Sequence, residues 1–216
     1  MGEDNVSTRD SGKRGSVVVV SGPSGVGKST VCHRLCEMLP AEFSISVTTR
    51  PLRPGEQHDK DYRCVDRDEF LRLREAGDFL EWAEVYGNLY GTSKTAIEQA
   101  VAAGKVIILE IDINGCVQVR RHIPEAITFF LLPPTPGEQQ RRIEGRKTDS
   151  AEVIRARLAK ADGEIRYASE AGCYDEFIIN DDLEETIDKA YAIIRGRRDA
   201  RPTHAGVDVH DQTAKG

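Results

Sequence analysis

The sequence has no long apolar run and no excess of positive charge. None of its uninterrupted apolar segments approaches the roughly 20 residues that cross a membrane, and residues 1–15 lack the apolar centre of a signal peptide. The net charge of −6 argues against a general nucleic-acid binder, which would normally be basic. We therefore expect a cytoplasmic protein with no membrane and no nucleic acid among its partners.

Cysteine is sparse and irregularly spaced. An odd, scattered set of thiols indicates reduced cysteines and no disulfide framework. The segment Cys32-His33-x-x-Cys36 invites a zinc interpretation, but these two thiols lie one helical turn apart and no second ligand pair follows at zinc spacing. We therefore predict no metal site among the five cysteines, which are Cys32, Cys36, Cys64, Cys116 and Cys173.

Strand and helix signals alternate along a chain of 216 residues, which is long enough for one domain with inserted lobes. Alternation of this kind predicts an α/β fold with a parallel sheet flanked by helices. Polar end segments with few large apolar residues predict disordered tails at 1–15 and 199–216. Buried strands are expected at 16–21, 106–112, 126–132 and 177–180, with a further short strand at 43–47, and helices at 29–39 and 182–195.

Two segments interrupt this alternation. Residues 46–95 contain short strand signals and many turns. This segment is too long for a simple crossover between strands, and it predicts an inserted substrate lobe. Residues 137–171 are rich in arginine and predict a helical lid. The domain of residues 16–198 then has a core made of 16–45, 96–136 and 172–198.

The segment from Gly22 to Thr30 reads Gly-Pro-Ser-Gly-Val-Gly-Lys-Ser-Thr and fits the phosphate-binding P-loop pattern G-x-x-x-x-G-K-[ST]. In such a loop the backbone N–H groups form a concave nest for an anion, Lys28 reaches the outer phosphates, and the Ser29 hydroxyl binds Mg²⁺. An apolar run precedes the motif and a helical pattern follows it, as the pattern requires. A nucleoside triphosphate is therefore the predicted ligand of Gly22, Pro23, Ser24, Gly25, Val26, Gly27, Lys28, Ser29 and Thr30.

Further motifs lie in the predicted lobe and core. They are Ser46-Val47-Thr48-Thr49-Arg50-Pro51-Leu52-Arg53-Pro54-Gly55-Glu56, Asp61-Tyr62, Phe79-Leu80-Glu81, Gly87-Asn88-Leu89-Tyr90-Gly91-Thr92, Leu109–Gly115, Pro133-Pro134 and Asn180–Asp182. Together with the P-loop, they resemble the guanylate kinase family in the same order over about residues 16–195. The resemblance implies a P-loop NTPase-type sheet with an inserted GMP-binding lobe and a helical lid. It also implies Mg²⁺-dependent phosphate transfer from ATP to GMP, and to dGMP as a second acceptor.

The same resemblance assigns roles to single residues. A guanidinium group suits a phosphate, and a carboxylate offers two acceptors to the N1–H and N2–H₂ donors of guanine. The GMP site would contain Ser46, Arg50, Arg53, Tyr62, Glu81, Tyr90, Thr92 and Asp112. Asn180 matches a position near adenine. The predicted catalytic groups are Lys28, Arg50, Arg146 and Arg157, the last two closing over ATP from the lid.

Some positions depart from the family or leave alternatives open. Asp59 stands where the family usually has glycine, which puts the backbone around Tyr62 in question. Lys147 replaces the glycine that usually follows the lid arginine. Glu110 suits a role beside the nucleotide as well as a helix-capping or packing role. Arg142, Arg155 and Arg166 are expected to be solvated charges on helices.

Two other functions compete with the kinase. Guanylate kinase-like modules of scaffold proteins bind phosphopeptides, but they usually have a degraded P-loop, whereas this one is intact. A P-loop kinase for another phosphorylated substrate would not need the full GMP-binding set. ATP and GMP are therefore the expected partners, and the sequence leaves a homo-oligomer open.

Overall fold

The computed structural model of the protein describes residues 15–85, 87–145 and 151–200. Of the two predicted tails, residues 1–14 and 201–216 lie outside these ranges. The C-terminal helix α7, Leu183–Asp199, extends four residues beyond its predicted end at residue 195 and so reaches into the predicted tail.

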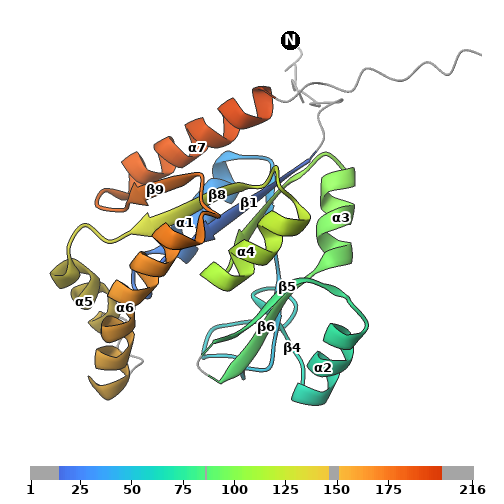
Figure 1. The fold of residues 1–216 in the computed structure, drawn as a ribbon, viewed down its shortest axis with the longest axis horizontal. Coiled ribbons are helices and arrows are strands. Elements are labelled where there is room, and N and C mark those ends of the chain that lie inside the picture. Colours follow the sequence, from blue (N-terminus) through green and yellow to red (C-terminus); the bar gives the residue numbers. More distant parts are fainter. Residues whose placement is uncertain (1–14, 86, 146–150, 201–216) are drawn as a thin grey trace, which may run out of the picture.

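A parallel sheet of five strands forms the core, in the order β2-β7-β1-β8-β9 (Figure 1). The strands are short and mostly apolar, as expected for a sheet that is covered on both faces. This arrangement confirms the predicted α/β fold class. The strand bounds are Ser16–Ser21 for β1, Ala41–Phe43 for β2, Val106–Glu110 for β7, Ile127–Leu132 for β8 and Glu176–Ile179 for β9.

Helices cover both faces of this sheet, and the alternation of side chains along β1 decides which residues meet which helices. Val18 and Val20 pack with α1 and α7 on one face, whereas Val17 and Val19 pack with α3 and α4 on the other. All four valines are almost completely buried. The helices are α1 Lys28–Met38, α3 Lys94–Ala102 and α4 Ile113–His122, in addition to α7.

Between α1 and α3 the chain forms a second, four-stranded sheet in the order β4-β3-β6-β5. Helix α2, Arg67–Glu75, packs Phe70 against Val47 and Leu89 and gives this part a small core of its own. The second sheet lies below the main one in Figure 1. Its strands are β3 Ser46–Thr48, β4 Tyr62–Cys64, β5 Phe79–Val85 and β6 Asn88–Ser93.

The predicted strand at 43–47 is wrong as a single element. Ala41–Phe43 pairs with β7 in the main sheet, whereas Ser46–Thr48 pairs with β4 and β6 in the second sheet. The Ser44 N–H still bonds the Ile108 carbonyl at 2.9 Å, and the exposed Ile45 follows at the change of sheet. Apolar residues on both sides of this change made two strands look like one.

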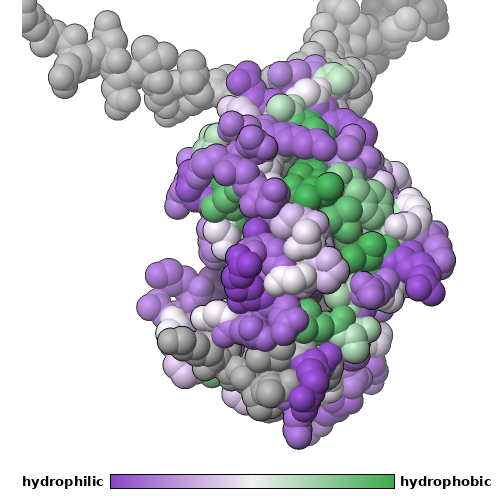
Figure 2. All heavy atoms as spheres, turned by 90° about the vertical axis from the view of Figure 1, so that its left-hand side faces the viewer, coloured by the Kyte–Doolittle hydropathy of each residue, from purple (hydrophilic) through white to green (hydrophobic). Residues whose placement is uncertain are grey.

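Two helices form the region predicted as a lid. Helix α5, Pro136–Glu144, begins at an N-cap in which Thr135 accepts a hydrogen bond from the Glu138 N–H, and α6 spans Ala151–Ala171. Figure 2 shows the face of the molecule on the α5, α6 and α7 side, where apolar surface interrupts a largely hydrophilic exterior. The edge strand β9 contributes exposed side chains of Phe177 and Ile179.

Candidate active site

The P-loop joins the end of β1 to the start of α1, so the strand–loop–helix context that the motif requires is present. The φ values of Gly22, Gly25 and Gly27 are 154°, 79° and 96°, which residues other than glycine rarely adopt. The Lys28 ammonium group folds back on the loop and donates to the carbonyls of Gly22, at 2.8 Å, and Pro23, at 3.1 Å. The loop therefore has the backbone form of an anion nest with a cation beside it.

Ser29 and Glu110 meet beside this loop. The Ser29 hydroxyl donates to a carboxylate oxygen of Glu110 at 3.1 Å, and Glu110 is the last residue of β7. Glu110 therefore lies beside the P-loop and at the start of α1, a position that suits either of the two roles left open for it. The pair offers oxygen atoms, which are the ligands that Mg²⁺ prefers.

Across the cleft, Arg50 contacts several polar side chains in and near the second sheet. Its guanidinium group donates to the Tyr90 hydroxyl at 3.1 Å and to both carboxylate oxygens of Glu56 at 3.0 and 2.9 Å, and it lies 5.0 Å from the centre of the Tyr62 ring. Burial raises the pKa of Tyr62 to about 12, with a smaller contribution from the charge of Glu110. Tyr62 therefore keeps its proton near neutral pH and remains a hydrogen-bond donor.

Arg53 extends from the same turn and is exposed, but it lines the cleft. Its backbone N–H donates to Glu56 at 2.8 Å, so a single carboxylate holds Arg50 by its side chain and Arg53 by its backbone. Ser46, at the start of β3, lines the same cleft. These contacts bring the predicted phosphate-binding cations and phenols together.

Glu81 is a buried carboxylate with only 4% of its surface exposed. Burial raises its pKa to about 7, the hydrogen bond from Thr92 opposes this rise, and the charge of Asp112 adds to it. A Cβ atom at Gly115 would lie 2.5 Å from Glu81 Oε2, so the first turn of α4 approaches this carboxylate very closely. A buried carboxylate with a raised pKa in a cleft is typical of a functional site.

The sequence predicted Asp112 at the end of a strand, but the structure does not place it in one. The strand β7 ends at Glu110, and Asp112 is the N-cap of α4, where its carboxylate accepts from the Gly115 N–H at 2.8 Å. The predicted sharing of one strand face by residues 110 and 112 is therefore wrong. The N-cap geometry places Asp112 in the cleft because the chain must turn there from sheet to helix.

Nine of the predicted site residues line one cleft of about 260 Å³. A larger cavity of about 630 Å³ is lined by α3 from Lys94 to Ala102 and by the end of α4 at His122, and contains none of the predicted site residues. Chemistry and not volume therefore identifies the candidate site. The predicted residues in the cleft are Gly22, Ser24, Lys28, Ser46, Arg53, Tyr62, Glu81, Tyr90 and Asp112, joined by Glu110.

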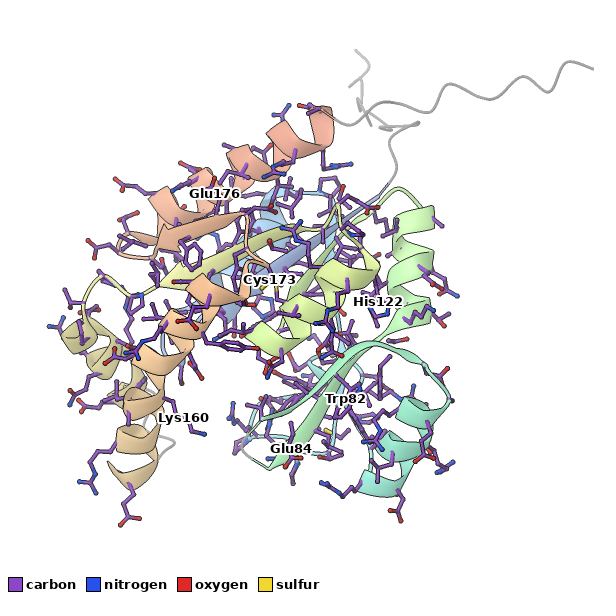
Figure 3. The ribbon with its side chains drawn as sticks, viewed as in Figure 1. Trp82, Glu84, His122, Lys160, Cys173 and Glu176 are labelled. Atoms are coloured by element: carbon purple, nitrogen blue, oxygen red, sulfur yellow. The ribbon has the colours of Figure 1, made fainter. Side chains whose placement is uncertain are left out.

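The structure also brings in residues that the sequence did not single out. Glu164 of α6 lines the cleft, and burial raises its pKa although the Lys28 charge opposes the rise. Figure 3 shows Lys160, one turn earlier in α6, projecting toward the second sheet, where Glu84 lies. The helical spacing of 160 and 164 is the sequence signal that could have indicated a shared face.

Arg142 is not the solvated helix charge that was predicted. Its guanidinium group donates to the carbonyl of Asn180 at 2.8 Å and contacts that of Asp181 at 3.4 Å, which connects α5 to the end of β9. Arg155 and Arg166 are exposed, as expected. Arg146 and the side chain of Arg157 lie outside what the structure describes, and so does Lys147.

Asp59 shows how the loop before Tyr62 accommodates its departure from glycine. Asp59 has φ 58°, the left-handed conformation, which aspartate tolerates better than most residues. Its N–H donates to the Tyr62 carbonyl at 3.0 Å. The loop therefore keeps a glycine-like turn, and Tyr62 reaches the cleft.

A family model described as "Guanylate kinase" matches residues 14–196. The chain belongs to the guanylate kinase family. Family members from two bacteria are similar over most of their length. "Guanylate kinase" of Aromatoleum aromaticum is 44% identical over 185 residues, covering 85% of this chain and 89% of the relative, and that of Dechloromonas aromatica is 47% identical over 182 residues, covering 84% and 89%.

A solved structure of the family agrees with the fold. The crystal structure of guanylate kinase from Anaplasma phagocytophilum superimposes with a TM-score of 0.71 and is 37% identical, covering 86% of this chain and 87% of that protein. Family membership therefore rests on sequence and on fold together. As a separate observation, helices in the described ranges include none that is long and apolar enough to cross a membrane.

Proposed function

We propose that this protein transfers the γ-phosphoryl group of ATP to GMP, giving ADP and GDP, and that dGMP is a second acceptor. The observation that carries this proposal is a single cleft that holds both halves of such a site. Lys28 and Gly22 of the P-loop line it on one side, and Tyr62, Glu81 and Tyr90 line it on the other. A transfer between two nucleotides needs the donor phosphate and the acceptor phosphate in one space, because positioning supplies much of the catalysis.

GMP recognition follows from the chemistry of the second sheet. The phosphate would bind Arg50 and Arg53, with the Tyr62 and Tyr90 hydroxyls as further donors. The ionised Glu81 carboxylate would accept from N1–H and N2–H₂ of guanine. Adenine would present an acceptor there and leave a buried charge unpaired, which costs affinity. Ser46, Thr92 and Asp112 complete the proposed base site.

The donor side combines charge with an oriented backbone. The N–H groups of the P-loop and the start of α1 would bind the ATP phosphates, and Lys28 would move from its carbonyl contacts to the outer phosphates. Arg50 on the acceptor side, with Arg146 and Arg157 from the lid region, would offset the charge that develops during transfer. These three arginines and Lys28 are the proposed catalytic groups.

Mg²⁺ is the proposed metal, and the oxygen donors near the P-loop fit it. Ser29 and Glu110 present a hydroxyl and a carboxylate 3.1 Å apart. The described residues contain no group of three or more His, Cys, Asp or Glu side chains that could hold a metal on its own. That suits a Mg²⁺ ion, which is commonly held by one or two protein oxygens, water and substrate phosphates. When bound, the ion neutralises phosphate charge.

The competing functions have weaker support. A protein-binding module does not need Lys28 beside an intact glycine loop, and a kinase for a different acceptor does not need a buried carboxylate at Glu81. The cytoplasmic location and the absence of nucleic-acid partners stay predictions from composition. The question of a homo-oligomer stays open.

A coupled assay of ADP formation with ATP and Mg²⁺ tests the proposal. We expect turnover with GMP, slower or equal turnover with dGMP, and none above background with AMP, CMP or UMP. Failure to convert GMP would overturn the proposed function. Conversion of AMP at a rate similar to that of GMP would overturn the assignment of Glu81 to guanine.

A further inference from the structure

Side chains donate hydrogen bonds to four carbonyl oxygens of the P-loop. Lys28 binds the first two, Gly22 and Pro23. The other two contacts come from distant parts of the sequence, since Gln139 Nε2 donates to the Ser24 carbonyl at 2.8 Å and Asn180 Nδ2 donates to the Val26 carbonyl at 2.7 Å. The role implied for Asn180 by the family resemblance, near adenine, does not account for this contact.

Burial and its place in helix α5 fix the position of the Gln139 side chain. Its side chain lies in the second turn of that helix and only 3% of its surface is exposed. A carbonyl oxygen can only accept, so the group that faces Ser24 must be the NH₂ of the amide. A buried amide placed against one loop carbonyl would be costly without that hydrogen bond.

Asn180 is held just as firmly. Only 4% of its surface is exposed. Its backbone N–H donates to the Leu132 carbonyl at 2.8 Å, and its own carbonyl accepts from Arg142 at 2.8 Å. With its backbone fixed on both sides, the side-chain amide has a defined direction toward Val26.

Holding these two carbonyls also directs two N–H groups. In a planar trans peptide the carbonyl and the following N–H point in opposite directions, and the described residues contain no cis peptide bond. The Ser24 carbonyl shares its peptide with the Gly25 N–H, and the Val26 carbonyl shares its peptide with the Gly27 N–H. Fixing each carbonyl on the side of Gln139 or Asn180 turns the paired N–H to the other side of the loop.

The glycines at these two positions let the supporting residues approach. A Cβ atom at Gly25 would lie 2.4 Å from Ile143 Cγ1 of α5, and one at Gly27 would lie 2.7 Å from Asn180 Nδ2. Both glycines also have left-handed φ values, 79° and 96°. The conformation and the packing therefore demand glycine at the same two peptides that Gln139 and Asn180 hold.

We propose that Gln139 and Asn180 are positioning residues of the phosphate site, which hold the Ser24 and Val26 carbonyls so that the Gly25 and Gly27 N–H groups face the ATP phosphates. This rests on the proposed function only in taking the P-loop as the site for those phosphates. It differs from a contact with adenine, because the effect reaches the ligand through the loop backbone and does not need a base.

Inorganic tripolyphosphate, which lacks adenine and ribose, is the probe that separates the two roles. We expect Gln139→Met and Asn180→Leu to weaken the binding of ATP and of tripolyphosphate by a similar factor, about tenfold for the loss of one buried hydrogen bond. KM for GMP should stay near its wild-type value. Calorimetry gives both dissociation constants without turnover, and the unfolding midpoint verifies that each variant is folded.

Gln140→Met is the matched control. Gln140 lies on the same helix, is exposed, and donates to Glu144 at 2.8 Å instead of to the P-loop, so we expect no change in triphosphate binding. Gln139→Glu and Asn180→Asp keep the size of the side chain but replace the donor with an acceptor, and they should weaken binding at least as much as the apolar variants.

Three results would overturn the proposal. They are wild-type affinity for tripolyphosphate in the Gln139 variants, a loss confined to ATP in the Asn180 variants, and an equal rise in KM for ATP and for GMP. Failure of the wild-type protein to convert GMP is a separate result. It would refute the proposed function but would leave the comparison of tripolyphosphate affinities intact.

Discussion

The Thr92 hydroxyl donates a 2.5 Å hydrogen bond to a carboxylate oxygen of Glu81. The two residues are cross-strand partners in β5 and β6, and both are buried. A carboxylate has lone pairs for further donors, so this bond fixes its orientation and leaves capacity for a ligand. In the proposed site, the pair would therefore present an oriented acceptor edge to the base, which would reduce the ordering that binding must impose.

Replacing Glu81 with glutamine should impair GMP recognition selectively. The amide NH₂ would face a donor of guanine at the point where the carboxylate presents an acceptor. We therefore expect KM for GMP to rise by about 100-fold. KM for ATP should hardly change, because the P-loop lies on the other side of the cleft. Steady-state kinetics with each substrate varied in turn measures both values.

Glu84→Gln is a control on the same strand. Glu84 is exposed, and its odd spacing from Glu81 puts it on the other face of the sheet. We expect wild-type kinetics from this variant. Equal losses for ATP and GMP in Glu81→Gln would contradict a role limited to the base.

The pKa of Glu81 predicts a pH dependence that is specific to the acceptor. Burial raises this pKa to about 7, and the proposed contact with guanine requires the ionised form. GMP binding should therefore weaken as the pH falls from 8 to 6, by up to about tenfold for each pH unit below the pKa. KM for ATP should not follow this trend, and Glu81→Gln should lack it, as a pH series of KM values for both nucleotides can establish.

The same group should make the protein less stable at high pH. Its pKa lies near 4.5 when exposed and near 7 when folded, so between these values the folded state retains a proton that the unfolded chain releases, and stability falls as the pH rises. Glu81→Gln should therefore raise the free energy of unfolding at pH 8 by up to about 3 kcal/mol. Urea unfolding at pH 8 and at pH 4.5 tests this, since the gain should vanish at the lower pH.

Local motifs predicted the two halves of the candidate site. The contacts that they did not predict depend on packing between residues far apart in the sequence. The P-loop and the Glu81 strand are short segments whose chemistry is visible in a few consecutive residues. Gln139 contacts a residue 115 positions away, and Asn180 one 154 positions away, so no local pattern reveals either contact. Arg142 looked solvated for the same reason.

The errors in element bounds also have physical causes. Asp112 followed an apolar run and was counted in its strand, but aspartate is a preferred N-cap and the chain enters α4 there. Residues 43–47 read as one strand because apolar residues continue through the change from one sheet to the other. Both errors lie at turns that only tertiary pairing defines.

Removing the ammonium group of Lys28 should abolish transfer and spare the acceptor. Lys28→Ala leaves the developing charge on the phosphoryl group without its nearest fixed cation in the P-loop, and we expect kcat to fall by about a thousandfold. The dissociation constant for GMP alone should remain close to that of the wild type, because Arg50 and Glu81 hold the acceptor in the proposed site. Calorimetric titration with GMP and single-turnover kinetics measure the two effects, and a large loss of GMP binding would contradict the division of the site into two halves.

The contact between Ser29 and Glu110 predicts how the protein depends on Mg²⁺. A hydroxyl and a carboxylate 3.1 Å apart can share one hydrated ion, so Ser29→Ala and Glu110→Gln should each raise the Mg²⁺ concentration needed for half-maximal rate. Loss of the charged ligand should have the larger effect, about tenfold or more, and excess chelator should stop turnover in the wild type. Cys36→Ala, on the same helix as Ser29 but in its last turns, should respond to Mg²⁺ as the wild type does. If Glu110→Gln showed an unchanged Mg²⁺ requirement and a raised KM for GMP, Glu110 would serve the acceptor and not the metal.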